Sequence, residues 1–100
     1  MEQYNVKIFP TAQSDLKNIV DYLNTLSPAA AVRHYDLIVE KVGALQTMPE
    51  RCALARDTQL RLRGYRLLIV ENYIVFFVIT GNTVEIRRIL YAKRQYKELL

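Results

Sequence analysis

The stretch YRLLIVENYIVFFVITGNTVEIRRIL, residues 65–90, decides the fold of this chain. It holds three runs rich in β-branched and aromatic residues, each of strand length. Glu71-Asn72 and Gly81-Asn82 separate the runs and are typical of tight hairpin turns. The middle run, residues 73–79, is apolar throughout, which predicts a central strand covered on both faces. The C-terminal half should therefore form an antiparallel meander.

The segments on either side of this stretch extend the predicted structure. QLRLR, residues 59–63, alternates polar and apolar residues and predicts one more strand before the meander. YNVKIF, residues 4–9, also alternates, and Pro10 should end that first strand. AKRQYKELL, residues 92–100, is typical of a short closing helix. We expect four to five strands and a C-terminal helix.

Residues 11–26 predict the first of two amphipathic helices. From a cap at Thr11, apolar residues recur at spacings of three and four, namely Ala12, Leu16, Ile19, Val20, Leu23 and Leu26. The other face should be solvated and carries Asp15, Lys17, Asn18, Asp21 and Asn24. Ser27-Pro28 then supplies a cap and a first-turn proline for a second helix, so the two helices should form an antiparallel hairpin.

The second helix has an apolar stripe of its own, made of Val32, Tyr35, Ile38, Val39, Val42 and Leu45, and it should end before Pro49. Gly43 inside this helix costs about 1 kcal/mol relative to alanine, which close approach of a neighbouring backbone would explain. Leu37 lies off the stripe and is expected to be exposed.

The order of these elements predicts an α+β fold. An N-terminal strand, an antiparallel helical hairpin, a mostly antiparallel sheet of four to five strands and a short C-terminal helix follow one another, with the hairpin on one face of the sheet. A chain of 100 residues with globular composition is large enough for one core. We therefore expect a single domain over residues 1–100.

Charge is distributed unevenly along the chain. Residues 1–50 hold four Lys and Arg against six Asp and Glu, whereas residues 51–100 hold ten against four. This asymmetry fits an anionic partner that faces the C-terminal half, and it fits a solvated basic sheet face equally well.

Composition also excludes several classes of protein. Cys52 is the only cysteine, so no disulfide framework or thiolate metal cluster is expected, and nothing implies a cofactor or a metal. The N-terminus lacks the pattern of a signal peptide, and no apolar stretch approaches the roughly 18 residues of a membrane span. We expect a soluble cytoplasmic protein with no membrane partner.

Several features, taken in order, resemble the RelE/ParE superfamily, the toxins of bacterial type II toxin–antitoxin modules. They are the first strand, the SPAAA turn of the helical hairpin, the ending from Leu45 to Pro49, a strand with Arg66, the hairpin ENYIVFF and the closing RILYAKR. The resemblance covers residues 4–100 and implies a small toxin that a co-expressed antitoxin neutralises by wrapping a helix or strand around it. It also implies a toxin–antitoxin complex that binds operator DNA through the antitoxin.

The superfamily has two branches, and the fold alone does not separate them. RelE-like toxins cleave mRNA in the ribosomal A site, whereas ParE-like toxins inhibit DNA gyrase and lack nuclease chemistry. RelE-like toxins place an arginine directly after the tyrosine of the central strand, where this chain has Ile74, and a tyrosine or histidine near the end, where Leu100 stands in one alignment. These departures and the long hairpin favour a ParE-like gyrase inhibitor, with a RelE-like endoribonuclease as the alternative and an inactive remnant or scaffold as a third.

The resemblance also suggests site residues. Metal-free RNA cleavage needs a base, an acid and cations near the phosphate. If the chain is RelE-like, its catalytic residues should be Arg66 and Arg94, with Tyr91 or Tyr96 as the acid–base group, although an ordinary tyrosine titrates near pH 10. The residues expected to bind an anionic target are Arg61, Arg63, Arg87, Arg88 and Lys93.

Other candidate residues have simpler interpretations. His34 is distant in sequence from the basic segment and is expected at the surface. Tyr73, Phe76 and Phe77 should be core residues, as should Ile89 and Leu90 of the last strand. Tyr65 could stack on a base or pack at the sheet edge, and Cys52 should be an inert thiol.

Overall fold

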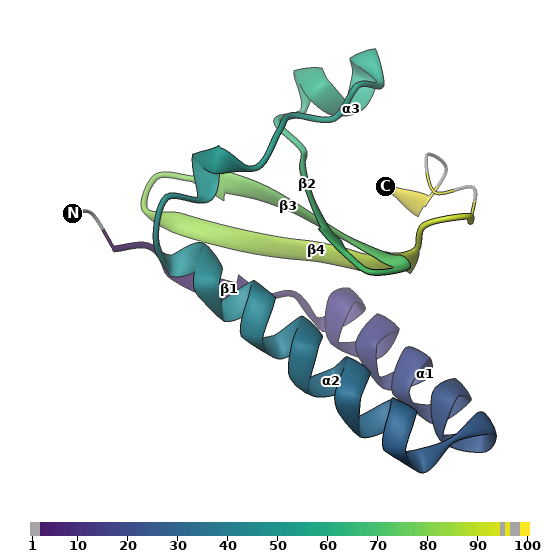
Figure 1. Cartoon of the computed structure of the whole chain (residues 1–100). Helices are drawn as coiled ribbons and strands as arrows, with labels where there is room; N and C mark the ends of the chain where they lie inside the picture. The colour runs from purple at the N-terminus through teal and green to yellow at the C-terminus, as the bar shows by residue number, and fades with distance from the viewer. Residues whose placement is uncertain (1–2, 95, 97–98) are drawn as a thin grey trace.

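The computed structural model describes residues 3–94, 96, 99 and 100. A sheet and a pair of long helices form its main layers (Figure 1). The strands are β1 (Asn5–Ile8), β2 (Arg66–Val70), β3 (Tyr73–Thr80) and β4 (Thr83–Tyr91). The helical hairpin consists of α1 (Pro10–Leu26) and α2 (Pro28–Gly43), and the segment leading to β2 contains η1 (Ala44–Gln46), η2 (Pro49–Arg51) and α3 (Thr58–Leu62).

The sheet has the strand order β1-β4-β3-β2. β1 runs parallel to β4, with Asn5 opposite Thr83 and Ile8 opposite Ile86, and the other two pairs are antiparallel. The predicted turn at Glu71-Asn72 joins β2 to β3, and Glu71 adopts φ +53° there. The predicted α+β fold with a mostly antiparallel sheet is confirmed, and the sheet has four strands.

The helical hairpin turns at the predicted position. The Ser27 hydroxyl accepts a hydrogen bond from the backbone N–H of Ala30 at 3.2 Å, and Pro28 occupies the first turn of α2. The predicted cap at Thr11 is wrong, because α1 begins at Pro10 and its N-cap residue is Phe9, whose side chain makes no capping bond. Proline suits that first position, where its missing N–H would have no partner in the helix.

Two apolar clusters lie on opposite faces of the sheet. The cluster on the hairpin side includes Ala12, Ile38, Val42, Leu45, Tyr73, Val75, Phe77, Val84, Ile86 and Ile89. The cluster on the other side includes Ala55, Leu60, Tyr65, Ile74, Phe76, Val78 and Leu90, so the segment around α3 covers the second face. The predicted burial of the central-strand aromatic residues, and that of Ile89 and Leu90, is confirmed.

A bulge in β4 shifts which of its residues face each cluster. Phe76 lies opposite Arg88 and Phe77 lies opposite Ile86, which leaves Arg87 as the extra residue. Because side chains alternate along a strand, the extra residue places both Ile86 and Ile89 on the hairpin side.

One predicted element is wrong, and another falls partly outside the described residues. Residues 59–63 belong to the helix α3 and its end rather than to a strand, because the Asp57 carboxylate accepts the Leu60 N–H at 3.1 Å and caps that helix. Alternation over five residues was too short to identify a strand. The expected closing helix includes residues 95, 97 and 98, which lie outside the described residues, and β4 is the last element assigned in the described part.

Details of α2 also differ from the predictions. Gly43 is the last residue of the helix, and an added Cβ would meet no atom within 4 Å, so no backbone approaches it closely. Leu37 is partly buried against the hairpin-side cluster, whereas Val32, Tyr35 and Val39 of the predicted stripe are 61%, 46% and 44% exposed. The buried line runs through Ala31, Ile38 and Val42 instead. In the described residues, no helix is long and apolar enough to cross a membrane.

Candidate functional site: a tyrosine-lined groove

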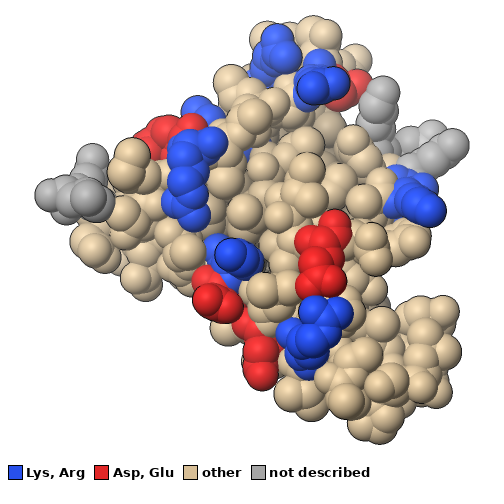
Figure 2. All heavy atoms as spheres, in the orientation of Figure 1, with Lys and Arg blue, Asp and Glu red and all other residues tan. Residues whose placement is uncertain are grey.

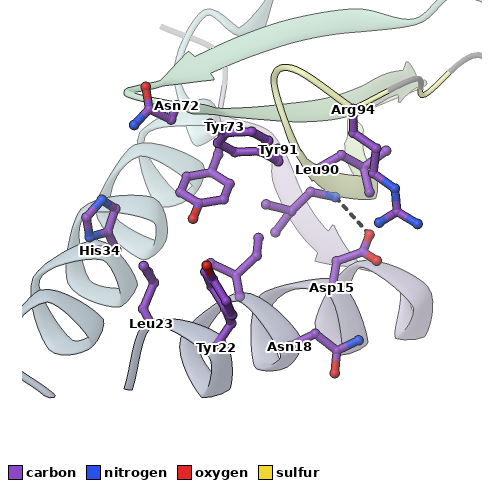
Figure 3. A pocket seen from close by; sticks show the side chains of 12 residues that line it. Asp15, Asn18, Tyr22, Leu23, His34, Asn72, Tyr73, Leu90, Tyr91 and Arg94 are labelled. Carbon is purple, nitrogen blue, oxygen red and sulfur yellow. Dashed lines mark hydrogen bonds between the residues drawn. The ribbon is translucent and has the colours of Figure 1, made fainter. Parts of the chain in front are cut away.

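A groove of about 600 Å³ lies where the helical hairpin meets the ends of β3 and β4 (Figure 3). Its apolar lining consists of Ile19, Leu23 and Ile89, together with Leu90, whose side chain belongs to the cluster on the other face of the sheet. Polar and aromatic side chains surround these residues, namely Asp15, Asn18, Tyr22, His34, Asn72, Tyr73, Tyr91 and Arg94. We call this cavity the tyrosine-lined groove. It joins residues from α1, α2, the β2–β3 turn and the end of β4.

Tyr73 is the central aromatic residue of the groove. Its ring packs edge-to-face against His34 and against Tyr91, with centroid distances of 5.9 Å in both cases. Burial raises the pKa of Tyr73, and the nearby hydroxyls of Tyr91 and Tyr22 raise it further. The Tyr73 hydroxyl therefore stays protonated at neutral pH and can donate a hydrogen bond.

Asp15 fixes the wall of the groove formed by α1 and β4. Its carboxylate accepts hydrogen bonds from the Arg88 guanidinium at 2.7 and 2.9 Å and from the backbone N–H of Ile89 at 3.0 Å. The hydrogen bond with Asp15 raises the pKa of Arg88. The expectation that Asp15 lies on a solvated helix face is wrong, since the residue is 9% exposed.

His34 also departs from its predicted place. Its side chain is only 13% exposed, and Nδ1 lies 2.9 Å from the carbonyl oxygen of Ala30, which requires Nδ1 to carry the proton and donate it. Nε2 lies 3.5 Å from the guanidinium of Arg33 and 4.0 Å from a carboxylate oxygen of Glu71. The hairpin thus brings His34 into the same groove as Arg94, sixty residues later, although the sequence suggested that they are distant.

The four residues proposed for catalysis do not form one site. Tyr91 and Arg94 line the tyrosine-lined groove. Arg66 instead donates hydrogen bonds to the carbonyl oxygens of Cys52 at 2.6 Å and Glu50 at 3.2 Å, which ties β2 to the preceding loop. Tyr96 packs on Phe76 in the second cluster, with a centroid distance of 4.8 Å.

The residues proposed for target binding mostly make contacts within the chain. Arg61 donates to the carbonyl oxygen of Ala55 at 3.1 Å, and Arg63 donates to that of Leu100 at 2.6 Å. Arg63 also lies 5.0 Å from the ring centre of Tyr65, which is 2% exposed and so cannot stack on a base. Both explanations of the charge asymmetry, an anionic partner and a solvated basic sheet face, are weakened because these two arginines donate hydrogen bonds within the chain.

The other residues proposed for target binding, Arg87, Arg88 and Lys93, differ in the contacts that their side chains make within the chain. Arg87 forms an ion pair with Glu85 at 2.8 Å, which raises the pKa of the guanidinium. Arg88 is paired with Asp15, whereas Lys93 is exposed. In the described residues, no side-chain partner is found for Lys93 or Arg94. On the face in Figure 2, basic side chains are scattered and many lie next to acidic ones, so they form no continuous basic block.

Sequence reasoning missed Asp15, Tyr22 and Asn72 as groove residues. One signal was available for Tyr22, because a large aromatic residue outside the apolar stripe of a helix is expected at the surface. In the structure Tyr22 is 63% exposed. The places of Asp15 and Asn72 depend on contacts between distant segments.

Comparison with known proteins relates this geometry to a family. The family model described as the ParE toxin of the type II toxin–antitoxin system parDE matches residues 6–96. The chain belongs to the ParE toxin family. This ParE-family chain is therefore a toxin of the type II toxin–antitoxin class, as the resemblance implied.

Two solved structures are similar to this ParE-family toxin. One, titled the chromosomal ParDE toxin–antitoxin system from P. aeruginosa, is 26% identical, with a TM-score of 0.77 over 91% of this chain and 98% of the other. The second is a chain of the RelBE2 toxin–antitoxin complex from Mycobacterium tuberculosis. It is 25% identical, with a TM-score of 0.64 over 93% of this chain and 97% of the other. A search of curated proteins found no match.

Proposed function

We propose that this toxin arrests bacterial growth by binding DNA gyrase and trapping its DNA-cleavage complex, and that it catalyses no reaction itself. The observation that carries the proposal is Ile74, which occupies the position of the RelE-like arginine. Ile74 is 8% exposed and belongs to the second apolar cluster, next to Phe76. An isoleucine at this point supplies no cation for a phosphate.

The neighbouring residues support the same proposal. Arg66 is engaged by two loop carbonyl oxygens, and the ring of Tyr96 packs on Phe76. RNA cleavage without a metal needs an acid, a base and cations directed at one phosphate, and the described residues of this sheet face supply no such group. The family match to ParE toxins agrees with the proposal.

We further propose that an antitoxin binds the toxin and neutralises it. Both solved relatives come from toxin–antitoxin systems, which supports a protein partner of this kind. Operator DNA would then be bound by the complex through the antitoxin. Gyrase acts on the chromosome, so the proposal also requires that the toxin works in the cytoplasm.

A supercoiling assay tests the proposed target. Purified toxin is added in rising amounts to gyrase, ATP and relaxed plasmid, and the products are resolved after protein denaturation. We expect loss of supercoiling and accumulation of linear DNA from trapped cleavage complexes. Toxin mixed beforehand with its antitoxin is the control and should have no effect. Normal supercoiling at a large excess of free toxin would contradict the proposal.

The alternative function is ribosome-dependent cleavage of mRNA. Tyr91 and Arg94 favour it in one respect, since both line the same groove and could contact a phosphate. Primer extension on mRNA from arrested cells distinguishes the two functions. Cuts at fixed positions within codons that disappear in Arg94→Ala would support the alternative, whereas intact mRNA during arrest would exclude it.

A further inference from the structure

We propose that the toxin docks on gyrase through a second groove, which lies between the two helices of its hairpin and receives a gyrase helix with an apolar face and basic flanks. This groove shares no lining residue with the tyrosine-lined groove. The inference rests on the proposed function, because that proposal supplies gyrase as the partner.

The second groove has a volume of about 510 Å³ and is mainly apolar. The helices that border it, α1 and α2, lie side by side in the hairpin (Figure 1). We call it the hairpin groove. Its apolar lining consists of Ile8, Leu16, Val20, Tyr35 and Val39, and its polar lining consists of Gln13, Lys17 and Asp21.

An exposed apolar ridge on α2 adjoins the hairpin groove. It consists of Val32, Tyr35 and Val39, whose spacings of three and four residues place them on one side of the helix. The sequence predicted all three as core residues, yet each is exposed in the structure. A contiguous apolar ridge that the fold of the toxin leaves uncovered indicates a surface for a partner.

A helix suits this surface better than an extended segment. α1 and α2 have 17 and 16 residues, so each is about 25 Å long, and a third helix can lie along the furrow between them for several turns. An extended segment binds by pairing with a free strand edge, which a pair of helices does not offer. Apolar side chains at helical spacing would insert among Leu16, Val20 and Val39.

Uncompensated negative charge borders the hairpin groove on the α2 side. Asp36 and Glu40 each directly follow a residue that lines the groove, and both are exposed. Among the described residues, neither carboxylate has an ion-pair or hydrogen-bond partner. On the α1 side, Lys17 and Asp21 pair with each other at 2.7 Å, so their charges cancel. The rim is therefore negative and favours Lys and Arg side chains on the partner.

This charge separates the possible occupants of the hairpin groove. DNA is disfavoured because its phosphates would meet Asp36 and Glu40. A second copy of the chain bound about a two-fold axis would place the same acidic rim against itself. Gyrase holds DNA, and a protein that does so carries Lys and Arg around the bound duplex. A helix at the margin of that basic surface has the charge that the rim requires, and docking there would place the toxin beside the DNA-cleavage site.

The test measures binding of the full-length toxin to purified, immobilised gyrase at physiological salt. We expect Tyr35→Ala and Val39→Gln each to raise Kd by about tenfold or more, because each removes a central apolar contact. Leu26→Gln is the matched control and should change Kd by less than about threefold. Leu26 is an exposed apolar residue of the same hairpin, but it lines neither groove.

A second pair of variants tests the charge of the rim. Glu40→Gln should raise Kd by about threefold and Glu40→Lys by about tenfold, because the first removes an attraction and the second adds a repulsion. High salt should reduce the difference between the two, since it screens exposed charges. Equal affinities of both variants and the wild type would contradict a basic partner at this rim.

The outcomes distinguish the inference from the proposed function. If wild-type toxin traps cleavage complexes and the folded Tyr35→Ala and Val39→Gln variants bind gyrase equally well, the inference is overturned and the proposed function stands. A wild-type toxin that neither binds gyrase nor inhibits supercoiling overturns both. Circular dichroism checks that the variants are folded.

Two further measurements identify another occupant of the hairpin groove. Loss of antitoxin binding in Tyr35→Ala and Val39→Gln, with gyrase binding unchanged, would assign the groove to the antitoxin. A wild-type dimer in sedimentation that Val39→Gln dissociates, with gyrase binding unchanged, would assign it to a second copy of the chain. Either result overturns the inference.

Discussion

The carboxylate of Asp15 on α1 binds the guanidinium of Arg88 on β4 through two hydrogen bonds, although 73 residues separate them in sequence. The same carboxylate accepts the backbone N–H of Ile89. β1 ends at Ile8, opposite Ile86, so the last residues of β4 have no strand beside them on that edge. Asp15 supplies an acceptor there in place of a strand.

Asp15→Asn should destabilise the fold. The amide replaces one carboxylate oxygen with an NH₂ group and leaves the partly buried Arg88 without its counter-charge, which costs about 3 kcal/mol. Urea denaturation measures the change. Asp21→Asn on the same helix is the control, since Asp21 forms only an exposed pair with Lys17, and its stability should stay at the wild-type value. Equal stabilities of the two variants would contradict the structural role of Asp15.

Gly43→Ala should stabilise the protein by about 0.5 to 1 kcal/mol, because alanine restricts the unfolded chain and suits a helix better. Gly43 has helical φ and ψ of −60° and −33°, and open space surrounds the new methyl group. Gly64→Ala should instead destabilise by about 1 kcal/mol, because Gly64 adopts φ +81°. Thermal unfolding of both variants checks the opposite signs; a loss of stability in Gly43→Ala would reveal a contact at this position.

Arg66→Ala should lower stability by about 1 to 2 kcal/mol, because it removes the hydrogen bonds to the carbonyl oxygens of Cys52 and Glu50. Arg94→Ala should leave stability unchanged, since the exposed Arg94 has no side-chain partner in the described residues. Chemical denaturation compares the two. A larger loss of stability in Arg94→Ala than in Arg66→Ala would show that Arg94 has a structural contact and is unavailable for a partner.

Cys52 should react slowly with thiol reagents in the folded protein. Burial raises the pKa of its thiol more than Arg51 and Arg66 lower it, so little thiolate exists near neutral pH. The unfolded thiol ionises at lower pH than the folded one, and ionisation therefore favours unfolding above about pH 8.5. Reaction with an aromatic disulfide should accelerate strongly in urea, and between about pH 8.5 and 10 stability should fall more steeply in the wild type than in Cys52→Ser. Fast modification of the folded chain would show that the thiol is accessible.

Local signals in the sequence were sufficient for most of the fold. Ser27-Pro28 and Glu71-Asn72 predicted their turns because capping and hairpin formation depend on neighbouring residues. The prediction of a strand over residues 59–63 failed because five alternating residues fit a strand and a short helix equally well. In this segment, Leu60 is buried and Leu62 is 81% exposed, so alternation did not correspond to one buried face.

The groove was harder to foresee than the fold. Its residues come from four separate segments, and their meeting depends on how the hairpin lies on the sheet. Asp15 looked solvated because a carboxylate at the margin of an apolar stripe is usually exposed, and its partner Arg88 could not be identified from one sequence. His34 was treated as distant from the basic segment because sequence separation was the only measure of distance.

The parallel pairing of β1 with β4 has a consequence for synthesis of the toxin. Residues 5–8 pair with residues 83–86, so the first strand has no neighbour in the sheet until almost the whole chain has been translated. A product that terminates before residue 83 lacks β4, which lies between β1 and β3 and is central to both clusters. Incomplete chains released from the ribosome should therefore be unfolded and harmless, so that toxicity begins only with the finished protein.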